Sequence, residues 1–111
     1  MNTLPKIPDE EKWASLSFME QMANIGSEVG RTAKWVAKEK PSMAEGAFIR
    51  ALDLIDLTIK VGRKGQSNRY DMLRELCTCR GVFCDAYLKK ETKELNGLDK
   101  YFGHFARAVR R

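Results

Sequence analysis

The sequence predicts an all-α protein, an antiparallel up-and-down four-helix bundle that forms one domain over residues 1–111. Apolar residues recur at steps of three and four in four segments, which is the spacing of helices with one buried side. No run alternates apolar and polar residues as a strand would, and the connections between the segments are short and polar. At 111 residues the chain can bury about two-thirds of its unfolded surface, so we expect a single core.

Residues 1–16 are expected to form a lead-in, which begins with a proline-containing stretch and can include a short helix. Asp9 is a plausible N-cap for that short helix. Ser17 and Glu20 have the spacing of a capping box. The first long helix therefore either starts near Ser17 or continues unbroken from Asp9, and we favour a start or a bend near Ser17.

The segment 18–36 carries the most regular apolar pattern and is expected to be the helix on which the others pack. Its seam consists of Phe18, Met22, Ile25, Val29, Thr32 and Val36. Beside the seam runs a row of small residues, including Gly26 and Gly30, that leaves a groove where another helix can approach. Glycine costs about 1 kcal/mol inside a helix, so both glycines indicate a packing constraint. The helix should end before Pro41, because proline disfavours helical geometry in the preceding residue.

A second helix is predicted to open at Ser42 and Glu45, which repeat the capping-box spacing, and to stop at Gly62. Its apolar face is made of Ala44, Ala47, Phe48, Ala51, Leu52, Ile55, Thr58 and Ile59. The segment 62–69 combines two glycines with three positive charges, so we expect a loop there.

A third helix is expected from Ser67 or Asn68 to about Lys90. Its apolar side is made of Tyr70, Leu73, Leu76, Cys77, Phe83, Cys84 and Tyr87. The residues 95–97 are expected to separate it from the last segment. There, a short fourth helix is predicted by the recurrence of Leu98, Tyr101, Phe102, Phe105 and Val109.

The three cysteines lie within eight residues and do not favour a metal site or a disulfide framework. Cys77 and Cys84 share one helical face, whereas Cys79 lies far around the helix, and no second cluster completes four ligands. We interpret the cysteines as small buried hydrophobes, with a redox role for an exposed Cys79 as the alternative. Free cysteines also favour the reducing cytosol, so we expect a cytoplasmic protein without metal or cofactor.

No catalytic constellation stands out, so the protein is not expected to be an enzyme. His104 is the only histidine and is expected to face solvent, and no glutamate stands three positions before it, as a di-iron bundle would require. Asp53 and Asp56 are expected to belong to a solvated face of the second helix.

Arg80 is expected in the middle of an apolar arc, where an unpaired guanidinium would be costly to bury. We expect it to pair with an acid on a neighbouring helix. The candidate partners are Glu28, Asp53 and Asp56. The alternative is that the arc is less buried than its pattern indicates.

Basic residues are the better functional indication, because they are grouped. Lysine and arginine number 20 against 15 acids, which gives a net charge of +5. One group crowds the loop after the second helix and another forms a stripe on the last helix, and such clusters contact phosphate backbones. The candidate nucleic-acid-binding residues are Arg63, Lys64, Arg69, Lys100, Arg107 and Arg111. The alternative interpretation is a solvated surface.

From Ser17 to Arg110, the chain resembles a known family of helical bundles. The resemblance lies in the number of helices, in their lengths and in the basic turn after the segment ALDLIDLTIKVGRKGQSN. This family comprises the proteins encoded in intervening sequences of bacterial 23S ribosomal RNA genes, with the accessory variability determinant of diversity-generating retroelements as a relative. The resemblance implies a basic, non-enzymatic, ring-like homo-oligomer, and its retroelement relative binds a reverse transcriptase and nucleic acid. The stretch SFMEQMANIGSEVGRTAKW also resembles one in an uncharacterised family of small bacterial proteins.

These observations lead to the hypothesis of a self-associating helical bundle that binds RNA or DNA backbone, as an accessory to a protein such as a reverse transcriptase. The alternative is a protein-interaction or structural bundle with no nucleic-acid role. It would use the groove of small residues, or an exposed Trp35 and Ile49, to contact a partner. The sequence has no signal peptide and no membrane span, so no membrane partner is expected.

Overall fold

The structure consists of helices throughout the part of the chain that the computed structural model describes, residues 8–64 and 70–109. One short helix and four long ones follow each other along the chain: α1 (Glu10–Ser15), α2 (Phe18–Ala37), α3 (Pro41–Lys64), α4 (Tyr70–Leu88) and α5 (Thr92–Val109). The predicted all-α class is confirmed, and the lead-in does contain a short helix. That helix is separate from α2, so the first long helix does not run unbroken from Asp9.

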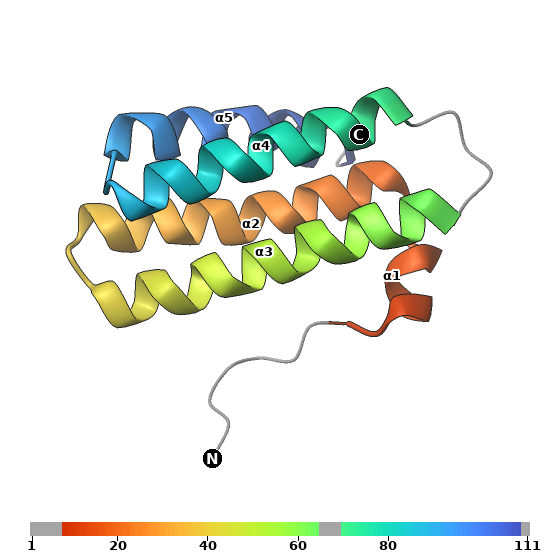
Figure 1. The fold of residues 1–111 in the computed structure, drawn as a ribbon, viewed down its shortest axis with the longest axis horizontal. Helices are drawn as coiled ribbons and strands as arrows, with labels where there is room; N and C mark the ends of the chain where they lie inside the picture. Colours follow the sequence, from red (N-terminus) through yellow and green to blue (C-terminus); the bar gives the residue numbers. More distant parts are fainter. Residues whose placement is uncertain (1–7, 65–69, 110–111) are drawn as a thin grey trace, which may run out of the picture.

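The four long helices lie side by side around one core (Figure 1). Helix α2 is the central element, since it makes the most extensive contacts of the fold with α5 on one side and α3 on the other. Helix α4 packs less closely against α3 and α5. No helix within the described residues is long and apolar enough to cross a membrane.

The predicted seam of α2 is buried in this core. Its buried members are Phe18, Met22, Ile25, Val29 and Thr32, with Val36 partly buried at the end. The capping box is confirmed as well, because the Ser17 hydroxyl accepts from the Glu20 amide (3.1 Å) and the Glu20 carboxylate accepts from the Ser17 amide (2.9 Å). These two bonds satisfy donors that the first turn would otherwise leave unpaired.

Helix α1 is fixed to α3 by Trp13, whose side chain is 2% exposed. Its indole N–H donates to the Thr58 hydroxyl (2.8 Å), and that hydroxyl donates in turn to the Leu54 carbonyl (2.8 Å). Asp9 caps α1 as predicted by accepting from the Lys12 amide (2.8 Å). A buried indole with a satisfied N–H gives this six-residue helix a stable position.

The row of small residues on α2 is filled by α5 of the same chain. A Cβ atom on Gly26 would lie 2.7 Å from the Cβ of Phe102, and one on Gly30 would lie 2.8 Å from the Asp99 carboxylate. The prediction that another helix approaches closely here is confirmed. Because α5 occupies the groove, the idea that this groove contacts a partner protein is wrong.

Two predicted boundaries of the second helix are wrong. Helix α3 begins at Pro41, whose fixed φ suits the first turn, so Ser42 lies inside the helix. At the other end, Gly62 does not stop α3, which continues to Lys64. The glycine is instead a site of close packing, since a Cβ atom there would lie 2.8 Å from the Leu73 side chain.

The expected break at 95–97 is also wrong, because these residues lie inside α5, which is a long helix. Leu95 is fully buried, and its packing against the core overrides the low helix propensity of Asn96 and Gly97. The break lies at Lys90 instead, just after the end of α4 at Leu88. The expected start of the third helix at Ser67 or Asn68 lies outside the described residues.

Helices α2 and α4 end in the same way, on a non-glycine residue in the left-handed conformation. Glu39 has φ 55° and Lys90 has φ 57°. The Glu39 amide donates to the Val36 carbonyl (3.0 Å), and the Lys90 amide donates to the Tyr87 carbonyl (3.1 Å). The next amide in each case donates to the carbonyl one residue further back, that of Trp35 or Ala86 (2.9 Å each). Each end therefore forms a Schellman motif, in which glycine is the usual residue.

We expect Gly26→Ala to lower the free energy of unfolding by about 1–3 kcal/mol, because the added methyl group must push α5 away from α2. Gly97→Ala is the matched control, since nothing lies within 4 Å of a Cβ atom at that position. The control should gain up to about 1 kcal/mol from helix propensity. Urea unfolding of both variants measures the difference, and equal effects would contradict the close approach.

Candidate nucleic-acid interface

Four of the six candidate binding residues lie in the described part of the chain, and all four are exposed. Arg63 and Lys64 form the last turn of α3, while Lys100 and Arg107 lie on α5. Arg69 and Arg111 lie outside the described residues. The described candidates therefore belong to two helices, α3 and α5, which both pack on α2 and α4.

The charge of Lys64 is partly neutralised by Glu10 on α1. The Lys64 ammonium lies 2.6 Å from one Glu10 oxygen, and the Lys60 ammonium lies 3.1 Å from the other. Hydrogen bonds first from Lys64 and then from Lys60 hold the pKa of Glu10 below its ordinary value of 4.5. Glu10 is therefore ionised at neutral pH, which makes Lys64 a weaker phosphate-binding candidate than the sequence indicates.

Arg63 has a different environment, a pocket of about 360 Å³ between α3 and α4. We call it the arginine–tyrosine pocket; its lining is Ile59, Arg63, Tyr70, Leu73, Arg74 and Cys77. Tyr70 is 70% exposed, and neither arginine forms an ion pair with an acid in residues 8–64 and 70–109. Sequence reasoning missed Arg74 and Tyr70, because only the packing of α3 against α4 brings them to Arg63.

On α5, Arg107 contacts His104, and the two side chains are exposed. The Arg107 Nη2 and the His104 Nδ1 lie 2.8 Å apart. A guanidinium only donates, so Nδ1 is the acceptor in this contact. His104 faces solvent as predicted.

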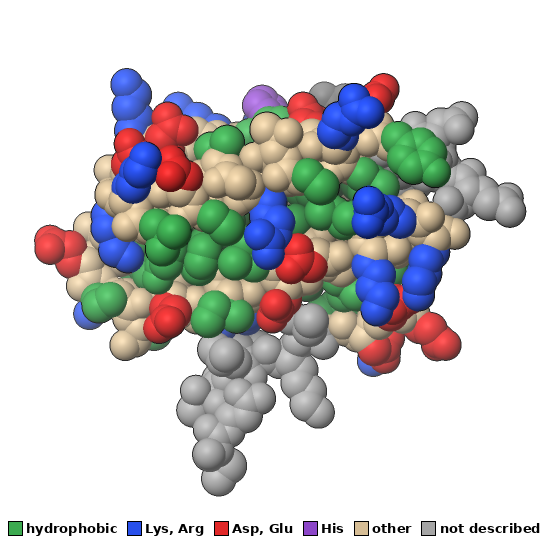
Figure 2. All heavy atoms as spheres, in the orientation of Figure 1, with side chains coloured by type: hydrophobic (Ala, Val, Ile, Leu, Met, Phe, Trp, Pro, Cys, Tyr) green, Lys and Arg blue, Asp and Glu red, His purple; other side chains and the backbone are tan. Residues whose placement is uncertain are grey.

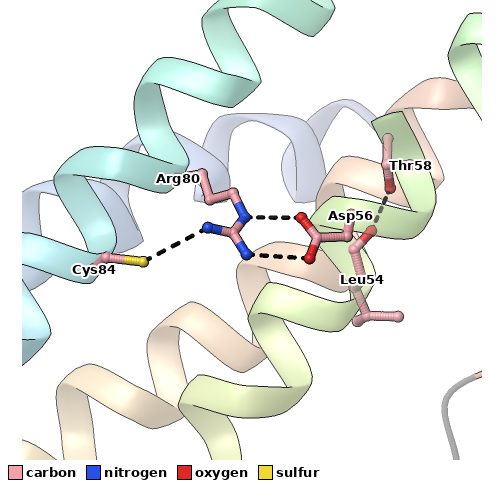
Figure 3. A network of polar contacts seen from close by, with 5 residues as sticks. All are labelled: Leu54, Asp56, Thr58, Arg80 and Cys84. Atoms are coloured by element: carbon pink, nitrogen blue, oxygen red, sulfur yellow. Dashed lines mark hydrogen bonds and ion pairs between the residues drawn. The ribbon is translucent and has the colours of Figure 1, made fainter. Parts of the chain in front are cut away.

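Arg80 pairs with Asp56, one of the three predicted partners (Figure 3). Its Nε lies 2.8 Å from Asp56 Oδ1 and its Nη2 lies 3.1 Å from Oδ2, a two-pronged contact between α4 and α3. The Arg80 and Asp56 side chains are 37% and 54% exposed. The arc around Arg80 is therefore less buried than its apolar pattern indicates, and the pair belongs to the surface.

The interpretation of the cysteines as buried residues is wrong for Cys77, which is exposed. Cys79 and Cys84 are partly buried, and Cys79 packs against the core. Burial, and then the Glu75 charge, raise the pKa of the Cys79 thiol, which disfavours the reactive thiolate. Within the described ranges, no three His, Cys, Asp or Glu side chains are grouped so that they could hold a metal ion.

The two residues proposed for protein contact have different surroundings. Ile49 is exposed, as predicted. Trp35 is partly buried, so the prediction that it is exposed is wrong. The ammonium groups of Lys34 and Lys38 lie 4.9 Å and 5.7 Å from its ring centroid. Figure 2 shows apolar side chains gathered over α3 and α4, with acidic and basic side chains interspersed.

Comparisons of this chain with protein-family models, with curated proteins and with solved structures give no match. The resemblance to the intervening-sequence family accordingly stays a prediction. The function is inferred below from the surroundings of the residues themselves.

We expect Arg80→Met to change the free energy of unfolding by no more than about 1 kcal/mol, because exposed ion pairs contribute little. Trp13→Phe is the contrasting variant, since it removes a buried hydrogen bond to Thr58 and should cost about 1–3 kcal/mol. Thermal and urea unfolding measure both. A larger loss for Arg80→Met than for Trp13→Phe would show that the fold requires the surface pair.

Proposed function

We propose that this protein is a non-enzymatic, antiparallel up-and-down four-helix bundle that binds RNA or DNA through phosphate contacts. The bundle topology is supported by the packing of each long helix on two neighbours, in the cycle α2, α3, α4, α5. Short connections between successive helices support it further. Such a fold leaves the outer side of every helix free for binding.

The observation that carries the binding proposal is the arginine–tyrosine pocket. Arg63 and Arg74 provide planar donor groups that match a phosphate, and no described acid neutralises them. The exposed Tyr70 provides an aromatic face on which an unstacked base can lie. Phosphate donors beside an aromatic ring favour single-stranded nucleic acid, whose bases are free to stack.

Lys100 and Arg107 on α5 add a second set of phosphate contacts in this proposal, and Lys64 adds a weaker one. The accessory role beside a reverse transcriptase and the ring-like homo-oligomer rest on the family resemblance. A cytoplasmic location is supported by the three free cysteines.

Charge reversal tests the pocket directly. We expect Arg63→Glu/Arg74→Glu to weaken binding of a labelled single-stranded RNA at least about tenfold, because two arginine–phosphate contacts become repulsive. Lys89→Glu/Lys93→Glu makes the same change in net charge away from the pocket and should have a much smaller effect. Fluorescence anisotropy measures the RNA affinity of the unchanged protein and of both variants. If the two variants lose the same affinity, binding depends on net charge and not on the pocket.

The stacking role of Tyr70 has its own test. Tyr70→Ala should weaken RNA binding about tenfold, since stacking contributes about 1–3 kcal/mol per base. Tyr70→Phe keeps the ring and should bind like the unchanged protein. If both variants bind equally well, the ring does not contact a base.

A second candidate function, self-association through an apolar surface, is favoured by the side chains that α3 and α4 expose. They are Met43, Ile49, Tyr70, Val82 and Leu88, of which Leu88 is 73% exposed. Apolar side chains gather over the same two helices in Figure 2. Large contiguous apolar patches are rare on monomeric proteins and commonly mark protein–protein contacts.

We expect Ile49→Asp to dissociate an oligomer that uses this surface, because the interface would have to bury a carboxylate. Met19→Asp is the matched control, as Met19 is similarly exposed (40%) but lies on α2. Size-exclusion chromatography with light scattering reports the mass of each variant. A monomeric unchanged protein, or an equal effect of both substitutions, would contradict self-association through α3 and α4.

A further inference from the structure

A second pocket, of about 500 Å³, lies where α1, α2 and α3 meet and does not include the arginine–tyrosine pocket. Its apolar wall is formed by Trp13, Leu16 and Leu54. Asn24 and Ser27 add polar groups to the lining. Its volume is within the range of pockets that hold small organic ligands.

The main charged feature of this pocket is Arg50 on α3, whose side chain is only 18% exposed. Its Nε lies 3.3 Å from Glu28 Oε1, but both atoms are fully buried and neither makes a hydrogen bond. Among the described residues, the Arg50 Nε donor and the Glu28 Oε1 acceptor are therefore buried and lack a hydrogen-bond partner. A buried polar atom without a hydrogen-bond partner is costly, and a ligand that reorients this pair would remove the cost.

Glu28 holds two guanidinium groups at the pocket. Its Oε2 lies 3.0 Å from Arg31 Nη1, while its Oε1 faces Arg50. With Lys12, the lining therefore contains three cations and one carboxylate, which leaves a net charge of +2. A phosphate monoester carries a charge of about −1.5 to −2 at neutral pH, so it would neutralise this excess.

We propose that this pocket binds a small phosphate monoester with an apolar body. Arg50 and Arg31 hold the phosphate oxygens, and Glu28 is a positioning residue that keeps the two guanidinium groups apart. The apolar body lies against Leu16, which is partly exposed, whereas Trp13 and Leu54 are buried behind it. This site is independent of the proposed nucleic-acid binding, because it uses none of the residues of that interface.

Isothermal titration calorimetry with phenyl phosphate tests the proposal. We expect saturable binding that Arg50→Lys weakens at least about tenfold, because lysine lacks the forked donors that hold two phosphate oxygens. Arg80→Lys is the matched control, since Arg80 also pairs with a carboxylate but lies away from the pocket, and it should bind phenyl phosphate normally. Circular dichroism confirms that each variant is folded.

A second variant and three other probes make the result decisive. Arg31→Gln, at an arginine that is 54% exposed, should also weaken binding without disturbing the fold. Benzyl alcohol, benzoate and inorganic phosphate should each bind more weakly than phenyl phosphate. The proposal is overturned if phenyl phosphate does not saturate the protein, if Arg50→Lys binds like Arg80→Lys, or if any of the three probes binds as tightly.

Discussion

The close approach of α5 to α2 is the constraint on which the rest of the structure depends. Gly26 removes the side chain that would otherwise separate the helices, so the Phe102 side chain enters the core beside the α2 seam. With α5 on one side of α2 and α3 on the other, α4 closes the arrangement by packing on both. The side of α5 away from α2 is then exposed, and it carries Lys100 and Arg107.

The distribution of acids decides which cations can bind a ligand, more than the number of cations does. Glu10 offsets Lys60 and Lys64, and Asp56 offsets Arg80, so these residues mainly connect helices. Arg63 and Arg74 have no such acid within the described residues, and they lie beside an exposed aromatic ring. The case of Arg50 is intermediate, because Glu28 approaches it without satisfying its hydrogen bonds.

Local signals in the sequence predicted much of the fold but little of the candidate sites. The capping box at Ser17, the seam of α2 and the packing role of Gly26 follow from spacing along one helix. The end of α2 before Pro41 and the end of α4 near Lys90 follow the predictions. The conformation of these ends could not be predicted, because Glu39 and Lys90 take a conformation that usually signals glycine. Tertiary packing likewise keeps Gly62 and Gly97 inside helices, against their local preference. The partners of Lys64 and Arg50 lie on other helices, and only their packing identifies them.

The most direct test of the proposed function is the salt dependence of RNA binding by the unchanged protein. Anisotropy of a labelled single-stranded RNA is compared at about 50 mM and 200 mM salt, a range over which several phosphate contacts cause a large loss of affinity. Saturable binding at the lower salt that falls steeply at the higher one is the predicted result. No binding at about 50 mM, or an affinity that salt leaves unchanged, would contradict phosphate recognition by this bundle.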